Sequence, residues 1–425
     1  MNRGQSIERH ACRSAPQAAI RVTVFILAGL LAGCGQPAAD ASGAATRAGL
    51  APSAAPSAST PAAPAPTTPA ALPRVRAVQL LTPTIGWALT DRELRLTTTG
   101  GDAWVTVTPP DVRADRLRGA TFLDQLHGWA IVSDEPDAEQ RTGLSVLRTV
   151  DGGRNWERAL LAAPSGVHTD ASAGPAALSF LDAQRGWAIV RLASSSNFSR
   201  GELFQTSDGG ATWRTRTAPS GDPVRFITAT DGWAAGGPGG GHLYASRDGG
   251  QSWQPQTVTL PEVFPTSRPG YALPTFFDSQ HGVLPVTFAG DDTTPSGLGF
   301  YTTRDSGKSW TLALTIPEES KPGAGVSLST QILSPTTWRV VHPGAKRVTT
   351  TRDGGRTAQA VTSTGLPASV AEITFVSDTV GWARAADAEC PATATKSPGK
   401  NGCRATTVQL FGTKDDGQTW SPLTP

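Results

Sequence analysis

Carboxylates and hydroxyls recur in a fixed arrangement along most of the chain. A Ser or Thr is followed two residues later by Asp, then by Gly after two more residues and by Trp three residues further on. The aspartates in this pattern are Asp151, Asp208, Asp248, Asp305, Asp353 and Asp415. Glycoside hydrolysis requires a pair of carboxylates about 5–9 Å apart. Acid–base chemistry on sugars is therefore the first possibility that these residues raise.

The number of copies argues for a structural role instead. Five copies are intact, one has Thr99 in place of Asp before Trp104, and one has Ala358 in place of Trp after Asp353. Seven near-equivalent segments cannot all form one active site. Asp followed by Gly is typical of a tight turn, because the carboxylate accepts hydrogen bonds from nearby backbone N–H groups and Gly tolerates positive φ. We expect the six aspartates to stabilise turns.

Other chemistries have less support. The sequence contains no His-Glu-x-x-His, Gly-x-Ser-x-Gly or Walker motif, and its six His are scattered. The chain has a net charge of +2, of which residues 1–33 carry +3, so the remainder is 2 − 3 = −1. Nucleic-acid binding needs a dense positive surface. The sequence indicates a non-catalytic protein without cofactor, metal or nucleic-acid partner.

A second motif lies between copies of the first. Gly-Trp pairs place Trp at positions 87, 129, 187, 233 and 382, and Gly282-Val283 and Thr337-Trp338 are interpreted as weaker copies. Seven residues earlier stand Leu80, Phe122, Phe180, Phe226, Phe276 and Phe375, with Gln331 as the exception. On this alignment all 12 Trp belong to one of the two motifs.

The two motifs together define a repeated unit of four strands, A to D in chain order. Strand A ends near the Phe, strand B starts at Gly-Trp, and the Asp turn joins strands C and D. Residues 74–425 comprise 352 residues, or about 50 for each of seven units. Four short antiparallel strands in 40–60 residues are typical of a propeller blade. We predict an all-β fold, a seven-bladed β-propeller of four-stranded antiparallel blades.

Segment lengths indicate which face carries function. The step from the Phe position to the Trp position is 7 in every unit, whereas the distance from strand B to strand D varies from 17 (104 − 87) to 38 (420 − 382). Strand direction alternates, so A–B and C–D turns share one face, and B–C and D–A loops share the other. Binding residues concentrate on variable loops of a rigid scaffold. We expect a protein, peptide or glycan to bind the variable-loop face.

The N-terminus is typical of a secreted protein. The apolar run at 22–33 has 12 residues, which is too short to span a bilayer and fits a signal peptide. It ends in Leu31-Ala32-Gly33-Cys34, which resembles the bacterial lipobox. The resemblance implies cleavage before Cys34, lipidation of its thiol and an extracytoplasmic, membrane-anchored protein of the cell envelope. Residues 34–73, rich in Ala, Pro, Ser and Thr, are predicted to form a disordered linker.

Two further cysteines stand 13 positions apart in a polar segment. Cys390 and Cys403 are predicted to form a disulfide, since an oxidising compartment favours one. A metal site is the weaker alternative, because no His or further Cys lies nearby in the sequence.

The motifs also resemble known families. The Asp turn resembles the Asp-box, or bacterial neuraminidase repeat, and the whole unit resembles the photosystem II stability/assembly factor family. The latter implies a seven-bladed propeller that binds protein during assembly of a membrane complex. Sialidases share the Asp-box, but they have six blades and an Arg-Ile-Pro signature that does not occur in this sequence. A binding propeller is the favoured hypothesis, and a sialidase-like glycoside hydrolase or glycan-binding propeller is the alternative.

Overall fold

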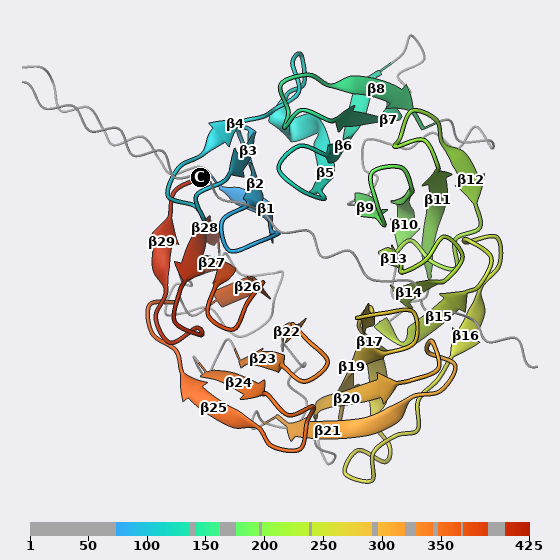
Figure 1. Ribbon diagram of the computed structural model, residues 1–425, viewed down its shortest axis with the longest axis vertical. Coiled ribbons are helices and arrows are strands. Elements are labelled where there is room, and N and C mark those ends of the chain that lie inside the picture. The colour runs from blue at the N-terminus through green and yellow to red at the C-terminus, as the bar shows by residue number, and fades with distance from the viewer. Residues whose placement is uncertain are drawn as a thin grey trace, which may run out of the picture. The chain divides into compact units, whose positions relative to one another are not determined.

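Seven small sheets form a ring in the computed structural model (Figure 1). The structure describes residues 74–136, 142–161, 176–194, 198–237, 240–290, 296–318, 329–342, 347–366, 369–389 and 404–425. The predicted seven-bladed β-propeller is confirmed. Across these ranges, no helix has the length and apolar character needed to cross a bilayer.

The blades follow one another along the chain. Blades 1 to 3 consist of β1 (Val75–Leu80), β2 (Gly86–Thr90), β3 (Leu94–Thr97) and β4 (Val105–Thr106); β5 (Leu117–Phe122), β6 (Gly128–Pro136), β7 (Thr142–Thr149) and β8 (Glu157–Leu160); and β9 (Ala176–Phe180), β10 (Gly186–Ser194), β11 (Ser199–Thr206) and β12 (Arg214–Arg216). A short 3-10 helix, η1 (Ala114–Arg116), precedes blade 2.

The remaining blades have the same order. Blades 4 to 7 consist of β13 (Val224–Phe226), β14 (Gly232–Gly236), β15 (His242–Ser246) and β16 (Gln254–Gln256); β17 (Arg268–Tyr271), β18 (Thr275–Phe276), β19 (Gly282–Ala289), β20 (Gly297–Thr303) and β21 (Thr311–Pro317); β22 (Ser329–Ile332), β23 (Trp338–His342), β24 (Arg347–Thr351) and β25 (Gln359–Thr362); and β26 (Ser369–Phe375), β27 (Gly381–Glu389), β28 (Arg404–Thr413) and β29 (Ser421–Leu423). In blade 5 both β17 and β18 pair with β19, so strand A is split in two.

Strand A lies innermost in each blade and strand D outermost (Figure 1). The residue after the Asp position donates its backbone N–H to a carbonyl of the A–B turn in every blade, over 2.7–3.1 Å; examples are Gly152 to Leu126 and Gly209 to Gln184. The A–B and C–D turns therefore share one face, as predicted, and we call it the tight-turn face.

Among the residues that the structure describes, pairs of aromatic rings lie between neighbouring blades at every junction except that of blades 6 and 7. The indole of Trp129 in β6 stacks on Phe180 of blade 3 with ring centroids 3.5 Å apart, and Trp187 of β10 stacks on Phe226 of blade 4 at 3.8 Å. Trp213, which follows the C–D turn of blade 3, meets the edge of Phe180 at 6.1 Å. Each such Phe is thus held between a Trp of the preceding blade and a Trp of its own blade.

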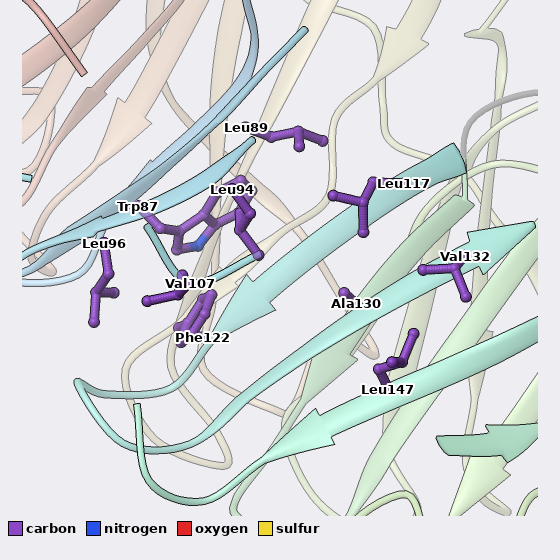
Figure 2. Close-up of a cluster of buried hydrophobic side chains, with 10 residues drawn as sticks. All are labelled: Trp87, Leu89, Leu94, Leu96, Val107, Leu117, Phe122, Ala130, Val132 and Leu147. Carbon is purple, nitrogen blue, oxygen red and sulfur yellow. The ribbon is translucent and has the colours of Figure 1, made fainter. Parts of the chain in front are cut away.

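The same packing joins blades 1 and 2. Figure 2 shows Trp87 and Phe122 within a cluster of ten buried side chains contributed by both blades. Burial of large apolar side chains contributes about 1.5–3 kcal/mol each, so these clusters supply most of the stabilisation between sheets.

In the part of the chain that the structure describes, side chains close the ring between blades 7 and 1. All strands of blade 1 come from residues 75–106, and all strands of blade 7 come from residues 369–423. No strand is exchanged between these two sheets. Trp382 packs against Leu80 and lies 5.4 Å from Trp104, measured between ring centroids.

The alignment of blade 6 predicted from the sequence is wrong by one residue. In the other blades the residue paired with the end of strand A is Gly, as in Phe122↔Gly128. In blade 6 that residue is Trp338, which pairs with Ile332 and Thr351. Arg339 therefore occupies the Trp position and Ile332 the Phe position, so the spacing of 7 is kept. Gln331 is no exception to the apolar position, and Trp338 stands outside both motifs.

Arg339 makes the same type of contact as the indoles of the other blades, because its planar guanidinium lies over a Phe ring of the next blade. Its side chain is fully buried, and its guanidinium lies 4.2 Å above the ring of Phe375 in blade 7. It donates to the carbonyls of Ser377 and Asp378, and its Nη2 lies 2.5 Å from Asp416 Oδ1. Asp416 adopts φ of 66° at a position where five of the seven blades have Gly. A strained aspartate thus compensates a buried cation.

We predict that Asp416→Gly destabilises the protein by about 2–4 kcal/mol, since removing one partner of a buried ion pair costs more than the backbone strain that Gly relieves. The double variant Arg339→Trp with Asp416→Gly should recover this loss, because it restores the pattern of the other blades. Urea unfolding measures the free energy of unfolding of the single and the double variant. Arg352→Gln, which removes an exposed partner of Asp416, is the control and should cost no more than about 1 kcal/mol. An Asp416→Gly protein as stable as the parent would contradict the prediction.

Candidate functional site

The six aspartates of the repeated motif lie in the C–D turns. Asp151 Oδ1 accepts hydrogen bonds from the Thr149 hydroxyl and the Asn155 backbone N–H, both at 2.9 Å. The Thr149 hydroxyl oxygen in turn accepts the N–H of Gly153 at 2.9 Å. Equivalent bonds to Oδ1 recur at the other five, from the residue two before and the residue four after each aspartate. The carboxylates are engaged within their own turns.

These hydrogen bonds favour the ionised carboxylate. Bonds from the Ser252 hydroxyl and backbone lower the pKa of Asp248 to about 2, and the corresponding bonds from Ser309 lower the pKa of Asp305 to about 2. At Asp208 partial desolvation acts in the opposite direction, but bonds from Thr212 outweigh it and the pKa is again about 2. A general acid for glycoside cleavage needs a raised pKa, so these groups do not suit that role.

The three cysteines of the sequence predictions, Cys34, Cys390 and Cys403, lie outside the described residues. So do large parts of the loops on the variable-loop face. Three of the exposed large apolar side chains lie on described parts of these loops or at their edges. They are Leu160 at the end of blade 2, Phe198 between β10 and β11 of blade 3, and Val263 between blades 4 and 5, with exposed fractions of 62%, 46% and 51%.

A cavity of about 520 Å³ lies in the central channel, on the side of the tight-turn face. Its walls are the ends of strand A and the beginnings of the A–B turns in blades 1 to 5. The sequence analysis pointed to the opposite face and missed this cavity. Its volume falls within the range of about 300–1,000 Å³ that is usual for small-ligand sites.

Polar side chains form a ring around the channel, one from each blade. Eight residues before the Trp position of strand B stand Gln79, Thr121, Ser179, Arg225, Thr275, Gln331 and Thr374, which we call the inner ring. None of the seven is fully buried, and the first five line the cavity. The corrected register of blade 6 is what assigns Gln331 to this ring. A hydrophilic residue recurring before the apolar Phe position was the signal in the sequence that could have indicated it.

Two charged side chains line the cavity. Arg225 donates through Nη1 to the carbonyl of Pro274 and to the Thr275 hydroxyl, at 3.4 and 3.3 Å. Asp278 accepts backbone N–H groups of Gln280 and His281 at 2.7 Å, and these bonds lower its pKa to about 2. Asp278 is the single acid of the lining, so the cavity lacks the carboxylate pair of a glycosidase.

Metal ligation has no support in the part of the chain that the structure describes, where no three His, Cys, Asp or Glu side chains are grouped closely enough to hold an ion.

Comparison with known proteins gave no match among family models or curated proteins. Solved structures do match. The chain is 18% identical to YCF48 bound to D1 peptide, covering 73% of this chain and 88% of that one, with a TM-score of 0.47. YCF48 from Cyanidioschyzon merolae is 19% identical, the match covers 75% of this chain and 94% of that one, and the TM-score is 0.46. The GH74 xyloglucanase from Xanthomonas campestris is 14% identical, the match covers 80% of this chain and 62% of that one, and the TM-score is 0.34. The propeller assignment itself stands on the strand pairing of this chain.

We predict that acid weakens the fold in a defined pH range. The folded-state pKa is about 2 for five of the six turn aspartates and is lowered for Asp415 as well. Because unfolded Asp titrates near 3.9, their contribution is complete above about pH 4 and is lost as the pH falls towards 2. The urea midpoint should therefore drop over this range. Asp248→Asn should lower the midpoint at pH 7 and reduce its acid dependence, whereas Asp102→Asn, at an exposed position, should do neither. Equal behaviour of the two variants would contradict the prediction.

Proposed function

We propose that the chain is a non-catalytic binding protein of the cell envelope, anchored to a membrane through lipid on Cys34. Its propeller binds a protein or peptide partner through the variable-loop face, in the manner of an assembly or stability factor. The signal-like run at 22–33 and the lipobox-like residues before Cys34 support the anchor. The contrast between the two faces of the ring supports the binding role.

The carrying observation is that the loops of this face differ in length between blades, since the distance from strand B to strand D varies from 17 to 38 residues, and that three exposed apolar side chains lie on these loops or at their edges. Leu160, Phe198 and Val263 belong to blades 2 and 3 and to the connection between blades 4 and 5. Exposed large apolar side chains favour association with another protein, and Leu123, Leu126 and Val150 are exposed on the opposite face as well, so the variation in loop length is what distinguishes the variable-loop face. The turns of the opposite face, by contrast, are joined to one another by backbone hydrogen bonds and vary little in length.

A peptide ligand also occurs in one of the similar structures, that of YCF48 bound to D1 peptide. A peptide is the class of ligand that we propose for this chain. The proposal rests on the loops of this chain and not on that similarity. The hydrolase alternative gains nothing from the cavity, whose single acid, Asp278, has a pKa of about 2.

Partner binding can be tested by site-specific photo-crosslinking in membranes. A benzophenone amino acid at Phe198 should capture a discrete partner, because this side chain is 46% exposed on the variable-loop face. The same group at Leu126, which is 41% exposed in an A–B turn, is the matched control and should capture none. A specific adduct from position 126 with none from position 198 would refute the assignment of the binding face.

Lipid anchoring can be tested by metabolic labelling with an alkyne fatty acid. The parent protein should incorporate the label and sediment with membranes, since two or more acyl chains give stable attachment whereas one does not. Cys34→Ala should remove the label and release the protein. Label that persists in Cys34→Ala would show that this cysteine is not the attachment site.

A further inference from the structure

The cavity on the tight-turn face contains a cation without an ionic partner. Within the residues that the structure describes, Arg225 forms no ion pair, and it donates through only one terminal nitrogen, to two acceptors at 3.3–3.4 Å. A guanidinium has five N–H donors and remains charged at any physiological pH. Arg225 is exposed and lines the cavity, and its other N–H donors bond to no described residue.

The surroundings of Arg225 favour an anion more than bulk solvent does. Packing of the neighbouring strands lowers the pKa of Arg225 through desolvation, even though water reaches it along the channel. Attraction between opposite charges strengthens as the local dielectric constant falls. The other charged group of the lining, Asp278, is bound to His281 through its backbone N–H and, at 2.8 Å, its ring Nδ1. Asp278 is therefore engaged in its own turn.

The number of cations in the lining indicates a monoanion. Arg225 is the single cationic side chain among the described residues of the lining, and Asp278 is occupied by hydrogen bonds within its own turn, so one carboxylate finds a partner and the second charge of a dianion does not. A single carboxylate matches the planar guanidinium, which can bind both of its oxygens. The organic acid class of ligand follows from this pairing.

The inner ring indicates that the ligand carries hydroxyl groups. Gln79 Oε1 accepts from Trp87 Nε1 at 2.8 Å and from the Thr121 hydroxyl at 3.2 Å. The amide N–H donors of Gln79 have no acceptor among the described residues, and Gln79 lines the cavity. Ser179 adds a further hydroxyl to the lining. Amide and hydroxyl side chains placed around a cavity give orientation and specificity to polar ligands.

Apolar side chains surround the mouth of the cavity. Six residues before the Trp position of strand B stand Leu81, Leu123, Leu181, Ile227, Phe277, Leu333 and Val376, all at least partly exposed, and four of them line the cavity. Such a border can contact the C–H groups of a ligand and reduce competition from water for the charge at Arg225.

From these observations we propose that the cavity binds a small hydroxylated organic acid, with the carboxylate on Arg225 and the hydroxyl groups on Gln79, Thr121 and Ser179. This site lies on the face opposite to the variable loops. It does not depend on the function proposed above.

Calorimetric titration of the full chain tests the proposal with four probes. D-gluconate carries a carboxylate and hydroxyl groups, sorbitol carries hydroxyl groups alone, hexanoate carries a carboxylate alone, and inorganic phosphate offers the alternative anion. D-gluconate should bind, and each of the other three should bind at least about tenfold more weakly, as expected for loss of a charge-assisted contact or of several neutral hydrogen bonds. Absence of D-gluconate binding, or phosphate, hexanoate or sorbitol binding equally well, would overturn the proposal.

Variants connect binding to the cavity. Arg225→Gln should weaken D-gluconate at least about tenfold, and Ser179→Ala should weaken it about fivefold, the effect of one neutral hydrogen bond. Arg214→Gln is the matched control, because Arg214 is an exposed residue of β12 outside the cavity. Unchanged affinity in Arg225→Gln, with folding verified by circular dichroism, would refute the role of Arg225. Photo-crosslinking at Phe198 should be unaffected in all three variants, which separates this site from partner binding.

Discussion

The stacking of an indole on a phenyl ring between neighbouring sheets is the interaction on which this structure depends. A four-stranded blade has two broad faces and cannot bury either of them alone. Trp129 on Phe180 and Trp187 on Phe226 fill the space between adjacent blades with flat rings that fit the gap closely. Because the rings project from strands A and B, they also fix the distance of each sheet from the channel. The polar inner ring and the cavity follow from that constraint.

Blade 6 shows how far the interaction tolerates chemical change. Arg339 lies over Phe375 as the indoles lie over their phenyl rings, since a planar guanidinium can stack on an aromatic face. The substitution is possible because blade 7 supplies carbonyl acceptors and the carboxylate of Asp416 at the same place. Planarity therefore allows Arg339 to take the place of an indole, although Val283 occupies this position in blade 5, and charge is accepted where the adjoining turn neutralises it.

Much of the fold could be predicted from the sequence, because the rings and turns that build it have distinct residue types at fixed spacing. Phe122, Gly128 and the Asp151 turn identify strands and their direction without reference to anything distant. Blade 6 was misaligned because the alignment relied on residue type. In this blade Trp338 occupies the position that Gly holds in the other blades, and Arg339, one residue later, occupies the Trp position. The cavity could not be predicted, because its lining comes from five separate blades, and the inner-ring residues that face it share only their polarity. Their convergence depends on the closure of the ring.

Closure without an exchanged strand has a consequence for the evolution and engineering of this chain. Each blade is encoded by one uninterrupted segment, and within the described residues the contact of Trp382 with Leu80 and Trp104 closes the ring through side chains. The packing thus does not require blade 1 to come first along the chain. Circular permutation that links Leu423 of blade 7 to Val75 of blade 1 and opens the chain between two other blades keeps every described sheet intact.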